Sequence, residues 1–147
     1  MDRLHIRPAL PEERLELEEL QRRASLALDT YRDQLEANPD AIDLPADQIE
    51  RGDVLVAEVD GRTAGFAVVL TEGDKAELDG LFVEPELWRH GIGAALVEAA
   101  THEARRRGLS LMTVVAEPAA KEFYERCGFT AEGTAETRFG PALRMSR

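Results

Sequence analysis

The chain has 147 residues, of which 44% are hydrophobic, and a formal net charge of −11. This length fits one domain, and we expect a single domain over residues 1–147. The negative charge argues against a nucleic-acid-binding protein, which needs a basic surface. The chain contains neither a run of about 18 apolar residues nor an N-terminal signal core, so we expect a cytoplasmic protein without a membrane partner.

The pattern of apolar residues predicts alternating strands and helices in chain order. Gly and Pro residues mark the ends of these segments. Residues 38–52 have no clear pattern and are expected to form a loop with one short helical turn. The expected elements are a strand at 4–7, a helix from Pro11, a second helical stretch at 29–38, strands at 53–59, 62–70 and 75–83, a helix from Ile92, a strand at 109–116 that is buried on both faces, a short helix at 118–129 and two closing strands.

The strand at 75–83 contains a phase error. Leu78, Leu81 and Val83 look like core positions, but the first two are three positions apart, whereas the side chains on one face of a strand are two positions apart. A β-bulge around Asp79 and Gly80 would restore the phase, and glycine is common at bulges.

Gly91 and Gly93 flank Ile92, at the point where the helix is expected to begin. The first turn of a helix carries free N–H groups and a partial positive charge, which attract anions. A Walker loop is excluded because Gly-Lys-Ser/Thr is absent, and a dinucleotide fingerprint fails because Leu96 stands where a third Gly or Ala is needed. What remains is a short phosphate motif, with Arg89 and His90 just before the glycines.

Three segments together resemble the GNAT superfamily of acyl-CoA N-acyltransferases. They are the bulged strand ending "LFVEPE", the glycine segment, and "EPAAKEFYERCGF" after the next strand. The resemblance implies an α/β (α+β) fold: a mixed, mostly antiparallel sheet splayed by the bulge, with helices on both faces. It also implies acetyl-CoA as co-substrate. No metal is expected, since the three histidines show no ligand spacing.

The resemblance also implies which residues hold acetyl-CoA. Backbone groups of Leu81, Phe82 and Val83 would pair with the acyl carbonyl and the pantetheine arm, as an added strand would. The pyrophosphate would lie against backbone N–H groups of residues 89–94, and a side chain at either glycine would occupy its space. The residues of this cradle are Arg89, His90, Gly91, Ile92, Gly93 and Ala94.

Tyr124, in "FYERCGF", matches the tyrosine that many members use as the acid toward the CoA sulfur, although it could also serve only to pack under the cofactor. Glu77 matches the position of a catalytic glutamate in some members, with Asp79 or a water as alternatives. Two positions depart from the family pattern. Trp88 replaces Arg or Gln and is expected to pack on the protein or cover the pantetheine. Glu117 replaces Asn and would bind a cationic acceptor or cap the following helix.

The expected function is direct acetyl transfer from acetyl-CoA to a primary amine of a small-molecule or peptide acceptor. Two alternatives remain: a CoA-binding module without turnover, and an acetyltransferase that modifies proteins. The identity of the acceptor is expected to depend on Tyr31 and residues 38–52. The sequence leaves a homodimer open.

Overall fold

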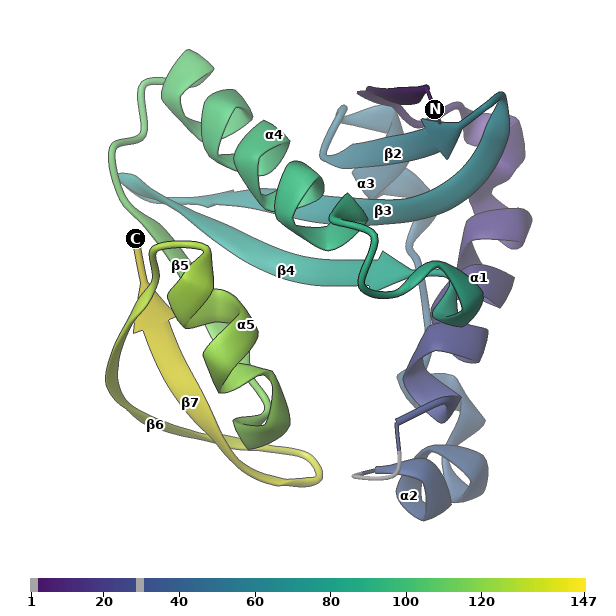
Figure 1. Cartoon of the computed structure of the whole chain (residues 1–147). Coiled ribbons are helices and arrows are strands. Elements are labelled where there is room, and N and C mark those ends of the chain that lie inside the picture. Colours follow the sequence, from purple (N-terminus) through teal and green to yellow (C-terminus); the bar gives the residue numbers. More distant parts are fainter. Residues whose placement is uncertain (1–2, 29–30) are drawn as a thin grey trace.

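The computed structural model describes residues 3–28 and 31–147, so the start of the second predicted helical stretch, residues 29–30, lies outside the described residues. The strands form one mixed sheet in the order β1-β2-β3-β4-β5-β7-β6 (Figure 1). Among the described strands, β4 and β5 form the one parallel pair. The strands are β1 (Leu4–Pro8), β2 (Val54–Val59), β3 (Arg62–Glu72), β4 (Lys75–Val83), β5 (Met112–Ala116), β6 (Thr130–Thr137) and β7 (Gly140–Ser146).

Helices cover both faces of the sheet where β2, β3 and β4 lie, as Figure 1 shows. One hydrophobic core lies under α4 and α5, and a second lies under α1 and α3 on the opposite face. No helix in the described ranges is long and apolar enough to span a bilayer. The helices are α1 (Arg14–Leu26), α2 (Arg32–Ala37), α3 (Ala46–Glu50), α4 (Ile92–Arg106) and α5 (Lys121–Arg126).

The sheet opens between β4 and β5. The two strands pair only from Ala76 to Leu78 on β4, which then continues to Val83 without a β5 partner in the described ranges. On its other edge β4 stays paired with β3, but Asp79 is an extra residue between the pairs formed by Leu78 and Gly80. The predicted bulge is therefore confirmed. Bulges increase local twist, and the strands diverge from this point (Figure 1).

One expectation about secondary structure needs correction. β5 was expected to be buried on both faces, but its burial alternates: Val115 is 43% exposed and Leu111, just before the strand, is 42% exposed. The physical reason is that α5 covers one face of this half of the sheet, while the other face has no described helix over it (Figure 1). Residues 38–52 contain the short helical turn that was expected, α3, and they also bury Leu44 and Ile49.

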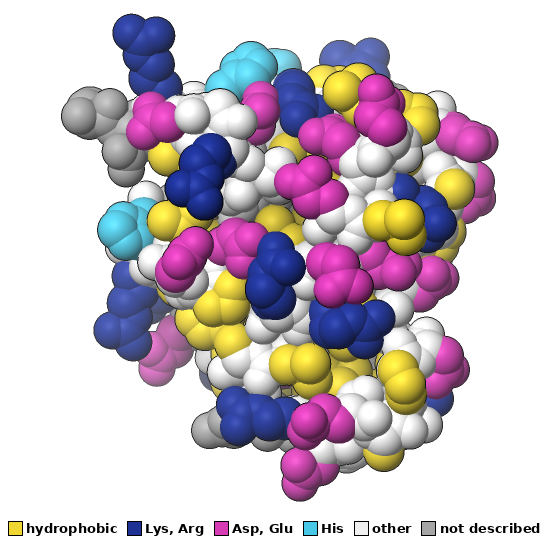
Figure 2. All heavy atoms as spheres, turned by 90° about the vertical axis from the view of Figure 1, so that its right-hand side faces the viewer, with side chains coloured by type: hydrophobic (Ala, Val, Ile, Leu, Met, Phe, Trp, Pro, Cys, Tyr) yellow, Lys and Arg dark blue, Asp and Glu magenta, His cyan; other side chains and the backbone are white. Residues whose placement is uncertain are grey.

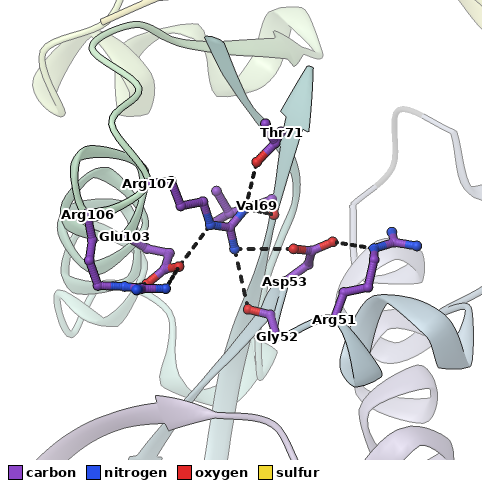
Figure 3. Close-up of polar contacts among 8 residues, drawn as sticks. All are labelled: Arg51, Gly52, Asp53, Val69, Thr71, Glu103, Arg106 and Arg107. Atoms are coloured by element: carbon purple, nitrogen blue, oxygen red, sulfur yellow. Dashed lines mark hydrogen bonds and ion pairs between the residues drawn. The ribbon is translucent and has the colours of Figure 1, made fainter. Parts of the chain in front are cut away.

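A polar network fixes the C-terminal end of α4 to the sheet (Figure 3). The Arg107 guanidinium forms ion pairs with Glu103 at 2.8 Å and with Asp53 at 3.2 Å. It also donates to the Val69 carbonyl oxygen at 3.1 Å. Because Asp53 is only 8% exposed, its charge depends on partners within the protein. Arg107 thus joins the end of α4 to β3 and to the residues just before β2.

We expect Arg107→Met to lower the free energy of unfolding by about 2 kcal/mol, because the substitution removes hydrogen bonds to charged groups that are largely shielded from water. Asp53 and Glu103 each keep one partner, Arg51 and Arg106 respectively. Arg106→Met is the matched control, since Arg106 also pairs with Glu103 but its side chain is 68% exposed. An exposed pair contributes about 0–1 kcal/mol. Urea denaturation of both variants measures the difference. Equal losses would contradict the role given to Arg107.

Candidate functional site

A cavity of about 670 Å³ lies where β4 and β5 diverge. Its walls come from α1, α2, β4, the turn before α4, β5 and α5. Its volume falls within the range of small-molecule and cofactor sites. The predicted site residues that line it are Leu81, Phe82, Val83, Arg89, Gly91, Ile92, Gly93, Ala94 and Tyr124, whereas His90 and Glu77 are not part of its lining.

One end of the cavity is the turn that leads into α4. Gly91 adopts a left-handed conformation with φ of 80° and precedes the first helical residue, and Arg89 also has a positive φ of 68°. Within residues 3–28 and 31–147, no backbone N–H of residues 89–94 donates a hydrogen bond to the protein. These groups are free to bind an anion, and the positive end of the helix favours one.

The two glycines of this turn have different reasons for lacking a side chain. A Cβ at Gly91 would meet no protein atom within 4 Å, so its positive φ is what favours glycine. A Cβ at Gly93 would meet the Phe123 ring at 3.1 Å. The expectation that a side chain at Gly93 would point into pyrophosphate space is therefore corrected. Gly93 lets α5 approach α4 closely and so sets the width of the cavity.

The middle of the cavity is the open edge of β4. Leu81, Phe82 and Val83 pair with β3 on one side and face the cavity on the other, where an extended ligand could pair with the backbone. Trp88 lines the cavity here, and its Nε1 donates a hydrogen bond to the Val83 carbonyl oxygen at 2.8 Å. Trp88 therefore packs on the protein, which is one of the two expected alternatives. It also forms part of the cavity wall.

Tyr124 lines the same cavity from α5. Its side chain packs edge-on against Phe123 and Phe129, with ring centroids 5.1 and 5.4 Å away. The residue is 8% exposed, and its hydroxyl has no hydrogen-bond partner in the part of the chain that is described. No fully buried side-chain polar atom is left unpaired among the described residues, so this hydroxyl opens onto the cavity. Burial raises the pKa of the phenol, which keeps its proton available.

Two carboxylates of β4 lie near the bulge and differ in access. Asp79 lines the large cavity, and burial raises the pKa of its carboxyl, with a further contribution from Glu72. The Glu77 side chain does not line the cavity. Burial and the neighbouring carboxylates of Glu72 and Asp79 raise its pKa from 4.5 to about 7. Such a pKa suits a general base at neutral pH, but from this position Glu77 would act through a water.

The raised pKa of Glu77 predicts a pH-dependent stability effect. Because the folded protein binds the Glu77 proton more tightly than the unfolded chain does, stability from this group is present below pH 4.5 and is lost as pH rises through about 7. We expect Glu77→Gln to raise the melting temperature relative to wild type more at pH 8 than at pH 5, by the equivalent of about 1 kcal/mol after solvent screening. Glu136→Gln, at an exposed strand position, is the control. An effect independent of pH would contradict the assignment.

Tyr31 lines the cavity and contacts a segment distant in sequence. Its ring centroid lies 6.1 Å from that of Phe139 in the β6–β7 turn. Arg138 of the same turn donates to Asn38 at 3.0 Å and pairs with Asp40 at 3.3 Å. Figure 2 shows the right-hand side of the molecule in Figure 1, on which acidic and basic side chains intermingle with exposed hydrophobic side chains.

Some of the residues that line the cavity were not predicted from the sequence. The residues in question are Ser25, Leu28 and Leu35 of the α1–α2 region, which line the cavity without forming a motif. Residues 38–52 were expected to face the acceptor. Instead, some of them line a second cavity of about 200 Å³, whose other walls include Asp79 and Gly80 at the bulge. In the described ranges, no three His, Cys, Asp or Glu side chains are grouped so that they could hold a metal ion.

Comparison with known proteins identifies the family of this chain. The family model described as "Acetyltransferase (GNAT) family" matches residues 15–129. The chain belongs to the GNAT family. The matched range includes β4, the glycine turn, α4, β5 and α5, which together form most of the cavity wall.

Relatives within the GNAT family match about half of the chain. An uncharacterized N-acetyltransferase of Methanocaldococcus jannaschii is 34% identical over 84 residues, which are 50% of this chain and 37% of that protein. The ribosomal protein bS18 alanine N-acetyltransferase of Escherichia coli strain K12 is 32% identical over 84 residues, or 55% of this chain and 56% of the relative. The match thus spans 37% of the M. jannaschii relative and 56% of the E. coli relative.

A solved GNAT structure matches the whole fold. The PaiA N-acetyltransferase of Thermoplasma acidophilum, in complex with coenzyme A, superposes with a TM-score of 0.80 and covers 99% of this chain and 98% of its own. Its sequence is 21% identical, so this likeness concerns the fold alone. The mixed, mostly antiparallel, splayed sheet predicted from the sequence is confirmed by this match and by the strand pairing.

Proposed function

We propose that this chain transfers an acetyl group from acetyl-CoA to a primary amine. The observation that carries the proposal is a single cavity. At one end of it lie N–H groups without a partner in the described part of the chain, and the Tyr124 hydroxyl lies in its wall. The N–H groups suit a phosphate, and the hydroxyl suits a thiolate that must gain a proton. Family membership and the coenzyme A bound by the T. acidophilum neighbour support the same ligand.

In this proposal acetyl-CoA lies along the open edge of β4. The pantetheine arm pairs with the backbone of residues 81–83, as an added strand does. The pyrophosphate binds the N–H groups of residues 89–94, and Arg89, which lines the cavity, adds positive charge there. Backbone N–H groups that point at the thioester oxygen would stabilise the negative charge that develops there.

The reaction then proceeds by direct attack. The neutral amine nitrogen bonds to the thioester carbonyl carbon, and the C–S bond breaks. The CoA sulfur leaves with the bonding electron pair and takes the phenol proton of Tyr124, which later recovers a proton from water. The amine's own proton passes to Asp79, which lines the cavity, or through water to Glu77. The products are the N-acetyl amine and the CoA thiol.

Release of the CoA thiol is the test of this function. The full chain is incubated with acetyl-CoA and a panel of small primary amines, and free thiol is measured against a sample without amine. Amine-dependent release supports the proposal, whereas acetyl-CoA binding without any release favours the CoA-binding module. The E. coli relative named as an alanine N-acetyltransferase of ribosomal protein bS18 supports adding peptides with an N-terminal alanine. Release with peptides alone would favour a protein-modifying enzyme.

Acetyl-CoA is expected to raise the melting temperature with increasing concentration, because it binds only the folded chain. At 100 times Kd the gain is about 2.7 kcal/mol, which corresponds to several degrees for a domain of this size. ATP and NAD should raise the melting temperature much less, since they carry phosphates but no pantetheine arm. Differential scanning fluorimetry measures all three. Equal shifts from ATP would contradict an acyl-CoA site.

A further inference from the structure

The Glu117 carboxylate lies in the cavity wall and does not stabilise the fold through a hydrogen bond or ion pair in the described ranges. It directly follows β5 and precedes the 3-10 turn Pro118–Ala120, where a carboxylate could cap the turn. Its side chain makes no capping hydrogen bond and forms no ion pair within the described ranges. Pro118 has no N–H to offer, and the Ala120 N–H is bonded to the Glu117 carbonyl oxygen instead. The alternative that Glu117 caps the helix is therefore excluded.

The Tyr124 hydroxyl opens onto the same space. It belongs to a side chain more than nine-tenths buried and has no partner in the described ranges. The Glu117 charge contributes, after burial and Cys127, to the raised pKa of the Tyr124 phenol, so the two groups lie within electrostatic reach of each other. Burial also raises the pKa of the Glu117 carboxyl, because nothing in the fold compensates its charge. A half-buried carboxylate and a hydroxyl, neither of which has a partner in the described ranges, line one wall and indicate a polar ligand between them.

The acidic and basic side chains of the cavity wall come from different elements. Asp79 and Glu117 lie on the diverging ends of β4 and β5. Arg89 lies in the turn before α4, and Arg126 ends α5. A carboxylate that bound only the reacting ammonium group would hold its proton in place and oppose attack. A second positive charge on the acceptor, in contrast, stays protonated throughout the reaction and can remain beside a carboxylate.

We propose that Glu117 selects acceptors that carry a second positive charge, so that the preferred class is small aliphatic diamines. One amino group reacts near Tyr124, and the other, protonated, pairs with the Glu117 carboxylate. The apolar wall formed by Leu28, Tyr31 and Leu35 suits the methylene chain between them. This inference rests on the proposed acetyl transfer and names its acceptor class.

The test compares two acceptors of equal length, 1,4-diaminobutane and 4-amino-1-butanol, in the thiol-release assay with the full chain. Wild type should show a kcat/KM about tenfold higher for the diamine, the ratio expected from about 1.4 kcal/mol for one partly solvated charge pair. Glu117→Gln should lower kcat/KM for the diamine about tenfold more than for the amino alcohol, chiefly through KM. Glu122→Gln, on the exposed side of α5, is the matched control.

Two results would overturn the inference: a wild type that prefers the amino alcohol, or a Glu117→Gln variant that loses both acceptors equally. Calorimetric titration of both amines into the chain with bound CoA repeats the comparison without turnover. Diamine binding that depends on Glu117, with no thiol released, would contradict only the proposed acetyl transfer. Binding that is unchanged by Glu117→Gln would contradict the inference even if acetyl transfer is present.

Discussion

Tyr124→Phe is expected to lower kcat for acetyl transfer by about 100-fold, within the range that a positioned general acid contributes. The Kd for acetyl-CoA should change by less than about threefold, because the substitution removes only an interaction made with the leaving sulfur. Stopped-flow thiol release at saturating acceptor measures kcat, and calorimetry measures Kd. Unchanged turnover would reduce Tyr124 to a packing residue.

The structure makes this substitution a clean one. The ring contacts with Phe123 and Phe129 involve no hydroxyl, so phenylalanine retains them. The hydroxyl has no partner in the described ranges that would be left unsatisfied. The melting temperature of the free chain should therefore stay within about 2 °C of wild type. A large loss of stability would instead mean that the hydroxyl has a structural role.

The second large effect is expected at Ala94, an exposed residue in the first turn of α4 that lines the cavity. Ala94→Glu places a negative charge among the N–H groups that are proposed to bind the pyrophosphate. We expect the Kd for acetyl-CoA to rise at least about tenfold, because two like charges about 4 Å apart near a surface repel by several kcal/mol. A glutamate in the first turn of a helix is favourable by itself, so the free chain should be as stable as wild type or more stable.

Ala94→Gln is the matched control, since glutamine has the same size without the charge. Its Kd should stay within about threefold of wild type, and added salt should reduce the difference between the two variants. If both variants weaken binding equally, the effect is steric and gives no support to a phosphate cradle. If neither variant weakens it, the pyrophosphate lies elsewhere.

The features that the sequence predicted correctly are those with a local physical cause. The three-residue step from Leu78 to Leu81 indicated the bulge, because strand faces alternate strictly. The strands expected at 53–59 and 62–70 are present as β2 and β3, and Asp60 and Gly61 between them have the positive φ angles, 52° and 80°, that a tight hairpin turn requires. The start of α4 after Gly91 followed from glycine's access to the left-handed region.

The features that the sequence did not predict depend on contacts between distant segments. An apolar run such as β5 looks the same whether one face or both are covered, so the exposure of Val115 had no signal. The contact between Gly93 and Phe123 exists only because α4 and α5 pack together. Likewise, Glu117 was recognised as a departure from the family pattern, but only the structure excluded its capping role.

The most direct test of the central claim is an NMR titration of the isotope-labelled chain with acetyl-CoA. The claim is that the opening between β4 and β5 holds the pantetheine arm and that the turn before α4 holds the pyrophosphate. The largest changes in amide shift are expected at residues 81–83 and 89–94, whose N–H groups would gain the ligand as partner. Saturable binding that leaves both segments unshifted, with the changes on another face, would contradict the account.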